Sequence, residues 1–358
     1  RATDLRPGPP QRLAGSRPNI VFIMSDDQGY GEMSCHGNPI LRTPHLDRLH
    51  AQSLRFTQYH VSPTCAPTRS ALLTGRHEFR NGVTHTIFER ERLRLDAVTL
   101  PDVLRTAGYT TGIFGKWHLG DEDAYLPEKR GFDRVLIHGG GGIGQTFPGS
   151  CGDAPGNQYH DPVLWNGSRF EKTRGYCTDV FFDRAGDWMA DCQAQGKPFF
   201  AVVTPNAPHD PFVIPGESWA APYRNRGLST NAVAYYAMIA HLDAAIGRLM
   251  ARLDALQLSQ DTLVIFQTDN GHSVGGVFNA GMRGVKGTPY EGGIRVPAFW
   301  RWPGRLPAGT DCAALTAHID LFPTLATLAG ADFRHVQKQV EGSSLVPLLE
   351  NPQAPWAD

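Results

Sequence analysis

The stretch VSPTCAPTRSALLTGR, residues 61–76, brings together residue types that could do chemistry at the start of one helix. Pro67 suits the first turn of a helix, and Gly75 suits its end. Cys65 is therefore expected at the helix N-terminus, where free N–H groups and the helix dipole favour an anion. Arg69 lies four residues further on, on the same helix face and within reach of that anion. The plain alternative is a buried structural cysteine, which describes most single cysteines.

Four short apolar segments are expected to form buried parallel strands, and each runs directly into polar residues. Their sequences are NIVFIM, YTTGIF, PFFAVVT and LVIFQT, at positions 19–24, 109–114, 198–204 and 263–268. The polar residues that follow them are Asp26 and Asp27, Lys116 and His118, His209, and Asp269 and Asn270. Because parallel strands of an open α/β sheet end at one edge, we expect these side chains to meet there.

The predicted cluster contains three carboxylates and one amide, which are the oxygen ligands that Ca²⁺ and Mg²⁺ prefer. No cysteines and histidines stand at the spacing of a zinc motif. Taken alone, the two adjacent aspartates could equally form a solvated turn. With the arginine and lysines nearby, the cluster indicates a combined metal and oxyanion site, of the kind that a sulfate or phosphate ester would occupy.

Three motifs together resemble the type I sulfatases of the alkaline-phosphatase-like superfamily. They are CAPTR followed by LTGR at residues 65–76, GKWHLG at 115–120, and KGTPYEGGIRVP at 286–297. The resemblance extends from about residue 19 to residue 349. It implies an α/β fold with a large, mostly parallel central sheet that is flanked by helices on both faces. It also implies a sulfuric ester hydrolase.

In that family the motif cysteine is oxidised by a maturation enzyme to formylglycine, whose hydrated diol attacks sulfur. Carried over by position, Cys65 becomes this nucleophile and also a metal ligand, and Arg69 supports it. Lys116 and His118 would steady the diol and its later collapse. A second hydroxyl on the same carbon provides a way to expel sulfate that a plain serine or cysteine lacks.

The remaining roles follow from the same resemblance. The metal, calcium first and magnesium second, would be held by Asp26, Asp27, Asp269 and Asn270. His209 and Lys286 would bind the ester and protonate the departing alcohol. The chain departs from the usual family pattern at Thr68 and Glu32, and neither change touches this chemistry.

The glycine-rich run HGGGGIGQ, residues 138–145, contains a Gly-x-Gly-x-x-Gly match. A dinucleotide site is rejected, because no helix pattern follows the match. The run is instead expected to form a loop at the rim of the pocket, with His138 facing the substrate. Residues 157–165 are rich in polar and aromatic groups, which would suit a sugar ring. We therefore expect a carbohydrate sulfate as the substrate.

Composition restricts the partners and the organisation of the chain. A formal charge of −1 and a pI near 7.0 argue against a nucleic-acid surface. No apolar run reaches the roughly 18 residues that a membrane span needs. We expect a polar linker at 1–18, a catalytic domain at 19–350, and the start of a further C-terminal subdomain at 351–358. The resemblance implies a periplasmic or extracellular protein, or a lysosomal or secretory one in a eukaryote.

Three questions stay open at this stage. A Cys151–Cys177 disulfide is one option among the six cysteines. Phosphodiesterases and phosphonate hydrolases of the same superfamily would share nearly every residue named above. A protein that binds sulfated glycans without catalysis, with Cys65 unmodified, is the alternative from another class.

Overall fold

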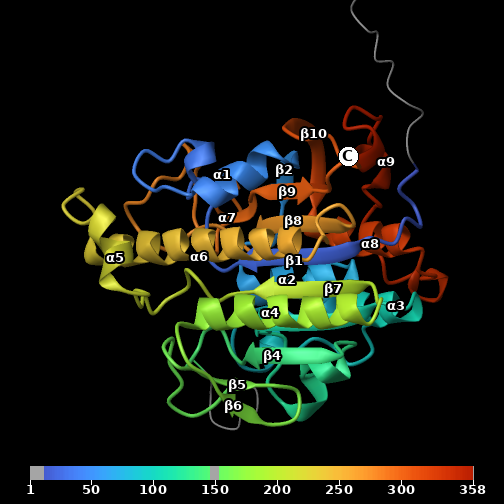
Figure 1. Cartoon of the computed structure of the whole chain (residues 1–358), viewed down its shortest axis with the longest axis horizontal. Coiled ribbons are helices and arrows are strands. Elements are labelled where there is room, and N and C mark those ends of the chain that lie inside the picture. Colours follow the sequence, from blue (N-terminus) through green and yellow to red (C-terminus); the bar gives the residue numbers. More distant parts are fainter. Residues whose placement is uncertain (1–11, 146–152, 358) are drawn as a thin grey trace, which may run out of the picture.

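The computed structural model describes residues 12–145 and 153–357. Within this part of the chain a single ten-stranded sheet runs through the molecule, with helices on both of its faces (Figure 1). The strand order is β10-β2-β9-β8-β1-β7-β3-β4-β5-β6. The expected α/β architecture with a large central sheet is therefore confirmed.

The centre of the sheet consists of the four predicted strands, lying side by side and all parallel. They are β8 (Thr262–Thr268), β1 (Asn19–Ser25), β7 (Phe199–Thr204) and β3 (Thr110–Lys116). A fifth strand, β4 (Arg134–His138), extends the parallel set beyond β3. Because all five run the same way, their carboxyl ends lie along one edge, where the site is built.

The outer strands make the sheet mixed. β9 (Ala298–Arg301) pairs antiparallel with both β8 and β2 (Leu54–His60), and β10 (Thr310–Ala317) runs parallel to β2. At the other edge, β5 (Val163–Trp165) and β6 (Phe170–Lys172) add two short antiparallel strands.

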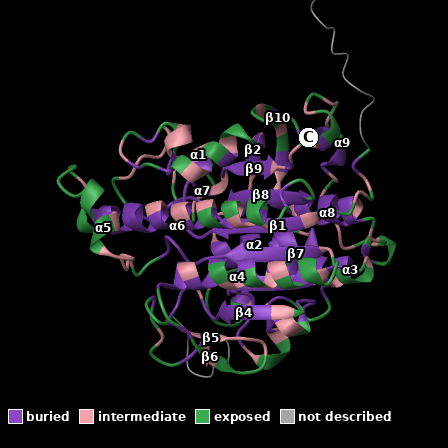
Figure 2. Cartoon of the chain, viewed as in Figure 1, coloured by how far each residue is buried: buried purple, intermediate pink, exposed green. Residues whose placement is uncertain are grey.

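Alternate residues of β1 enter two separate cores, one on each face of the sheet. Ile20, Phe22 and Met24 belong to the first core, and Val21 and Ile23 belong to the second. Burial on both faces explains why the central strands are unbroken apolar runs instead of alternating ones. In Figure 2 these strands are buried, whereas the long helices in front of them mix buried and exposed residues.

The helices divide between the two faces according to these cores. The second core is covered by α1 (Pro44–Ala51), α4 (Cys177–Ala194) and α6 (Thr230–Ala255). The first core is covered by α2 (Cys65–Thr74), α3 (Leu100–Thr106), α8 (Leu321–Ala329) and α9 (Val346–Glu350). Single-turn helices α5 (Glu217–Ala220) and α7 (Glu291–Ile294) and several short 3₁₀ turns connect these elements. No helix of the described residues is both long and apolar enough to cross a membrane.

The two ends of the described chain pack onto the domain. The N–H of Leu13 donates to the side chain of Glu350 at 2.7 Å, and the Trp356 indole donates to the carbonyl of Leu315 at 2.9 Å. The described part of the expected 1–18 linker is thus attached to α8 and α9. Residues 1–11, and with them most of that linker, lie outside the described residues.

Candidate active site

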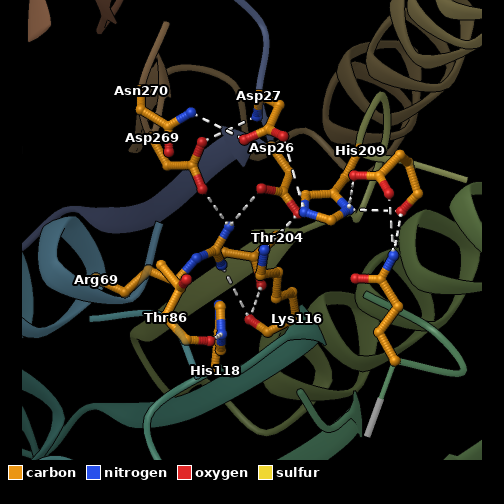
Figure 3. A network of polar contacts seen from close by, with 12 residues as sticks. Asp26, Asp27, Arg69, Thr86, Lys116, His118, Thr204, His209, Asp269 and Asn270 are labelled. Atoms are coloured by element: carbon orange, nitrogen blue, oxygen red, sulfur yellow. Dashed lines mark hydrogen bonds and ion pairs between the residues drawn. The ribbon is translucent and has the colours of Figure 1, made fainter. Parts of the chain in front are cut away.

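The polar residues that follow the central strands meet at one place, as the sequence predicts (Figure 3). The backbone N–H of Asp27 donates to Asp269 Oδ1 at 3.0 Å, and Asn270 Nδ2 donates to Asp27 Oδ1 at 2.9 Å. Asp27 has a left-handed backbone, with φ of 62°. A residue with a side chain rarely adopts this conformation unless its surroundings hold it there. Here the carbonyl oxygen of Asp27 accepts a hydrogen bond from Tyr235 at 2.7 Å.

A close approach of two strand ends sets the position of Lys116. At Gly115 a Cβ atom would lie only 2.0 Å from the carbonyl oxygen of Thr204, the last residue of β7. Only glycine fits between the two strands here. The Thr204 hydroxyl in turn donates to the carbonyl oxygen of Lys116 at 2.9 Å.

Each buried carboxylate has its own cationic partner. Lys116 Nζ lies 2.7 Å from Asp26 Oδ2, and Arg69 Nη2 lies 2.9 Å from Asp269 Oδ2. Lys286, on the loop before α7, places Nζ 2.7 Å from Asp27 Oδ2. All three carboxylates are completely buried, so these pairs are screened little by solvent.

Burial and neighbouring charges move the pKa values of the aspartates in different directions. Burial raises the pKa of Asp26 to about 6, although Lys116 opposes this shift. Burial and the negative charge of Asp26 likewise raise the pKa of Asp269 to about 6. Burial alone would also raise the pKa of Asp27, but Lys286, His209 and Lys116 together lower it below its ordinary value.

Two oxygen atoms of the cluster have no hydrogen-bond donor among the described residues. They are Asp26 Oδ1 and Asn270 Oδ1, and both are buried. A buried acceptor without a partner costs roughly 1–3 kcal/mol. A hard divalent cation would satisfy both atoms, and Asp27 and Asp269 add further oxygens within the same cluster. The residues present therefore fit the predicted calcium or magnesium site.

Cys65 begins helix α2, and Gly75 ends that helix in a left-handed conformation, as the sequence indicates. Cys65 is 1% exposed, and its Sγ lies within 4.8 Å of carboxylate oxygens of Asp26 and Asp269. Arg69, one helical turn later, also donates from Nη1 to the carbonyl oxygen of Lys116 at 3.1 Å. The helix thus places both residues beside the carboxylate cluster.

Two histidines complete the site, and the hydrogen bonds fix which ring nitrogen carries the proton. His118 Nε2 lies 2.7 Å from the carbonyl oxygen of Thr86 and 3.2 Å from Glu91 Oε2, so it is the donor and Nδ1 keeps the lone pair. Burial, with help from Lys116, lowers the pKa of His118 to about 4. His209 Nδ1 donates to the carbonyl oxygen of Asp210 at 2.6 Å, and its Nε2 lies 3.7 Å from Asp27 Oδ2.

A cavity of about 250 Å³ opens onto this cluster. Four of its lining residues were expected at the site, namely Cys65, His118, His209 and Lys286. The sequence did not single out the stretch from Thr86 to Glu91, which forms another part of the wall together with Gln145. The stretch is charged and shows no periodic pattern, so it resembles an ordinary surface loop. Its unusual features, the burial of Glu91 (2% exposed) and the left-handed backbone of Phe88 (φ of 55°), become visible only in the structure.

Two expectations about the substrate pocket differ from the structure. His138 is completely buried, its Nδ1 bonds to the carbonyl oxygen of Gly139, and it does not line the cavity. It lies at the end of β4 inside the protein, and the glycines that follow it form the wall instead. Residues 157–165 also lie away from the lining. Tyr159 in this segment supports the site indirectly, because its hydroxyl donates to the carbonyl oxygen of His209 at 3.0 Å.

The optional Cys151–Cys177 disulfide falls partly outside the described residues, because Cys151 is not among them. Cys177 is a free thiol, and its Sγ donates to Asn206 Oδ1 at 3.3 Å.

Comparisons of the sequence and the fold with known proteins identify the family to which this chain is similar. The sequence pattern of the Sulfatase family matches residues 18–331. Arylsulfatase A of Homo sapiens is 39% identical over 360 residues, which cover 94% of this chain and 69% of that protein. The crystal structure of Ps i-CgsB in complex with k-i-k-neocarrahexaose matches with a TM-score of 0.84 at 29% identity, covering 94% of this chain and 77% of that one.

A more distant match shows the fold alone. The phosphonate monoester hydrolase of Agrobacterium radiobacter has a TM-score of 0.66 at 20% identity, over 96% of this chain and 79% of that one. The family match, by contrast, covers most of the chain and includes every strand that supplies a site residue. The resemblance seen in the three motifs is thereby confirmed. The chain belongs to the sulfatase family and is an arylsulfatase-like enzyme that hydrolyses sulfate esters.

Proposed function

We propose that this enzyme hydrolyses the sulfate monoester of a carbohydrate, using a formylglycine made from Cys65 and one divalent cation, calcium in preference to magnesium. One observation supports this proposal above the others. Cys65 lies at a helix start on the wall of the cavity, within 4.8 Å of two buried carboxylates, one of which keeps an oxygen without a donor. A cysteine in this position is reachable from the cavity and lies beside the proposed metal.

The two groups that the chain would acquire supply distinct chemistry. When present, hydrated formylglycine would offer the attacking oxygen, and the cation would polarise the sulfate. The cation would be held by Asp26, Asp27, Asp269 and Asn270. Carboxylate oxygens of Asp27 and of Asp269 lie within 4.8 Å of one on Asp26, and Asn270 bonds to Asp27. A maturation enzyme that oxidises Cys65 would then be an essential partner.

The residues of the chain itself have roles that follow from their contacts. Arg69 and Lys116 hold the carboxylates of Asp269 and Asp26 in place and add positive charge beside Cys65. His118 keeps a lone pair on Nδ1 because its Nε2–H is already donated, and it lines the same cavity as Cys65, so it would act as an acceptor there. His209 and Lys286 line the cavity, and in this proposal they bind the ester and protonate the departing alcohol.

The charge of the site accommodates a sulfate ester, although charge counting alone also admits a phosphate ester. Three buried carboxylates are matched by three cations, so the cluster is close to neutral before a divalent cation binds. With the cation present, the site carries about two positive charges. A sulfate monoester carries one negative charge, whereas a phosphate monoester carries up to two near neutral pH. Because two positive charges can balance either ester, the preference for sulfate is supported instead by the family match over residues 18–331.

The walls of the cavity suit a sugar. Ile87 and Phe88 present apolar surface, and Gln145 presents an amide that already bonds to Asp210. Sugar rings combine apolar C–H faces with hydroxyl groups, which matches such a mixed wall. Support also comes from Ps i-CgsB, which was crystallised with k-i-k-neocarrahexaose.

By the same family relationship, we propose a periplasmic, extracellular, lysosomal or secretory location.

The test compares kcat/KM for sulfate and phosphate monoesters of one alcohol, and then for a panel of sulfated sugars. Faster turnover of the sulfate ester is expected, with further gain on at least one sulfated sugar. Faster turnover of the phosphate or phosphonate ester would contradict the sulfate preference. Turnover of aryl sulfates without any sugar would contradict only the carbohydrate part.

A further inference from the structure

Cys35, His36 and His50 form a cluster of potential metal ligands that the reaction above does not use. One ligand atom from each of them lies within 4.8 Å of the other two. All three are half-buried and line a cavity of about 290 Å³. This cavity shares no lining residue with the active-site cavity.

The cluster is held together by helix α1. Asp47 on α1 accepts hydrogen bonds from the N–H of Cys35 at 2.9 Å and from the hydroxyl of Ser34 at 2.7 Å. His50 follows Asp47 by three residues and therefore lies on the same side of the helix. The helix that anchors the turn carrying Cys35 and His36 thus also supplies the third side chain.

The two imidazole rings are fixed from outside the cluster. His36 Nδ1 lies 2.8 Å from the carbonyl oxygen of Tyr30, which can only accept, so Nδ1 carries the proton and Nε2 keeps its lone pair. An outer carbonyl that sets the tautomer in this way is typical of histidines that bind metals. Phe299 packs edge-on against both rings, with centroids 5.6 Å from His36 and 5.1 Å from His50.

Arg55 is the cation that contacts a proposed ligand directly, and it competes with a metal at this place. Arg55 Nη1 lies 3.3 Å from His50 Nδ1, which is long for a hydrogen bond. Arg55 is better held elsewhere, because Asp311 Oδ1 lies 2.5 Å from its Nε and the carbonyl oxygen of Gly309 lies 2.9 Å from its Nη2. A metal can therefore replace Arg55 as the partner of His50 with little loss of stabilising contacts. Asp311 would continue to neutralise the charge of the arginine.

We propose that Cys35, His36 and His50 form a second metal site, which binds a borderline transition-metal ion such as Zn²⁺. One sulfur and two imidazole ligands are the donors that Zn²⁺ prefers over Ca²⁺ and Mg²⁺. Ligand atoms around a tetrahedral zinc are about 3.3–3.7 Å apart, so atoms that already lie within 4.8 Å of one another would close by no more than about 1–1.5 Å. Binding releases the thiol proton of Cys35 to solvent, and the fourth position is left to water from the cavity.

The experiment uses Co²⁺ as a spectroscopic probe, because a cobalt–thiolate bond gives a charge-transfer band in the near ultraviolet. The protein carries Cys65→Ala, which removes the only cysteine among the described active-site ligands as a competing thiolate. We expect one Co²⁺ to produce the band and Zn²⁺ to displace it. Adding Cys35→Ser should abolish the band, and His36→Phe or His50→Phe should each weaken binding at least tenfold. Cys312→Ser, which changes a buried cysteine on β10, is the matched control and should leave the band intact.

A band that persists without Cys35, no band at all, or histidine variants that bind as well as the parent would overturn the proposal. A second measurement does not depend on how the variants fold. In the unsubstituted chain, Zn²⁺ should protect Cys35 from alkylation by iodoacetamide, as read from the mass of its peptide. Equal alkylation with and without Zn²⁺ would also overturn the proposal.

Discussion

Replacing Lys116 with methionine tests the charge balance of the site. Lys116 is completely buried, and its Nζ lies 2.7 Å from Asp26 Oδ2. Methionine keeps the length of the side chain but removes its charge, so Asp26 loses its nearest cation. Removing one partner of a buried ion pair typically costs about 3–5 kcal/mol. We expect a loss of this size in the free energy of unfolding when a chelator keeps the site free of metal.

Calcium should reduce this loss, because a cation bound beside Asp26 replaces part of the missing charge. The Lys116→Met protein should therefore bind Ca²⁺ at least tenfold more tightly than the parent. Each tenfold gain in Ca²⁺ affinity reduces the difference in unfolding free energy between the two proteins by about 1.4 kcal/mol, once both are nearly saturated with Ca²⁺. Turnover should fall sharply, since the same substitution removes positive charge next to the reacting group.

The assay is denaturant unfolding of both proteins, once with EDTA and once with Ca²⁺, together with calorimetric titration of Ca²⁺. Lys338→Met, at an exposed position, is the matched control and should behave like the parent. A Lys116→Met protein as stable as the parent in EDTA would refute the reasoning. A stability gap that Ca²⁺ leaves unchanged or widens would refute it equally.

Three further predictions concern the metal, the protonation of a buried acid and the cavity wall. Asp269→Asn should lose bound calcium, as measured by elemental analysis, together with sulfatase activity, whereas Asp261→Asn at the opposite end of β8 should keep both. Burial raises the pKa of Glu32 to about 8 from an ordinary value of 4.5, so the folded state holds this proton more tightly than the unfolded state. The contribution of Glu32 to the free energy of unfolding is complete below about pH 4.5 and is lost as pH rises to about 8, by about 1.4 kcal/mol per pH unit. Glu32→Gln should flatten this dependence of the unfolding free energy on pH. An unchanged dependence would contradict the assignment. Phe88→Ala should raise KM for a sulfated sugar about tenfold with little change in kcat, whereas Phe79→Ala, equally exposed at 63% but outside the cavity, should do neither.

The parts of the fold that the sequence predicts are those whose environment leaves a simple pattern. β1, β3, β7 and β8 are buried on both faces, so each appears as an unbroken apolar run. β9 has only four residues, and β10 alternates irregularly between buried and exposed positions. Neither sequence differs enough from that of a loop to be recognised as a strand. Their pairing depends on contacts between distant parts of the chain, which periodicity does not contain.

The residues of the site likewise fall into those that the sequence predicts and those that it does not. Asp26, Asp269 and Lys116 could be placed together because each stands at, or just past, the end of a parallel strand, and strand ends share an edge. The wall from Thr86 to Glu91 comes from a loop and a short 3₁₀ turn (Phe88–Glu91), whose position depends on tertiary packing. His138 also stands at a strand end, yet it is completely buried, so strand-end position by itself does not determine where a side chain points.

The mass of the peptide that contains Cys65, taken from a preparation with measured sulfatase activity, tests the central proposal most directly. We predict that residue 65 carries an aldehyde in place of its thiol, and that the aldehyde-containing fraction follows the specific activity from one preparation to the next. An active preparation in which residue 65 is entirely unmodified cysteine would contradict it.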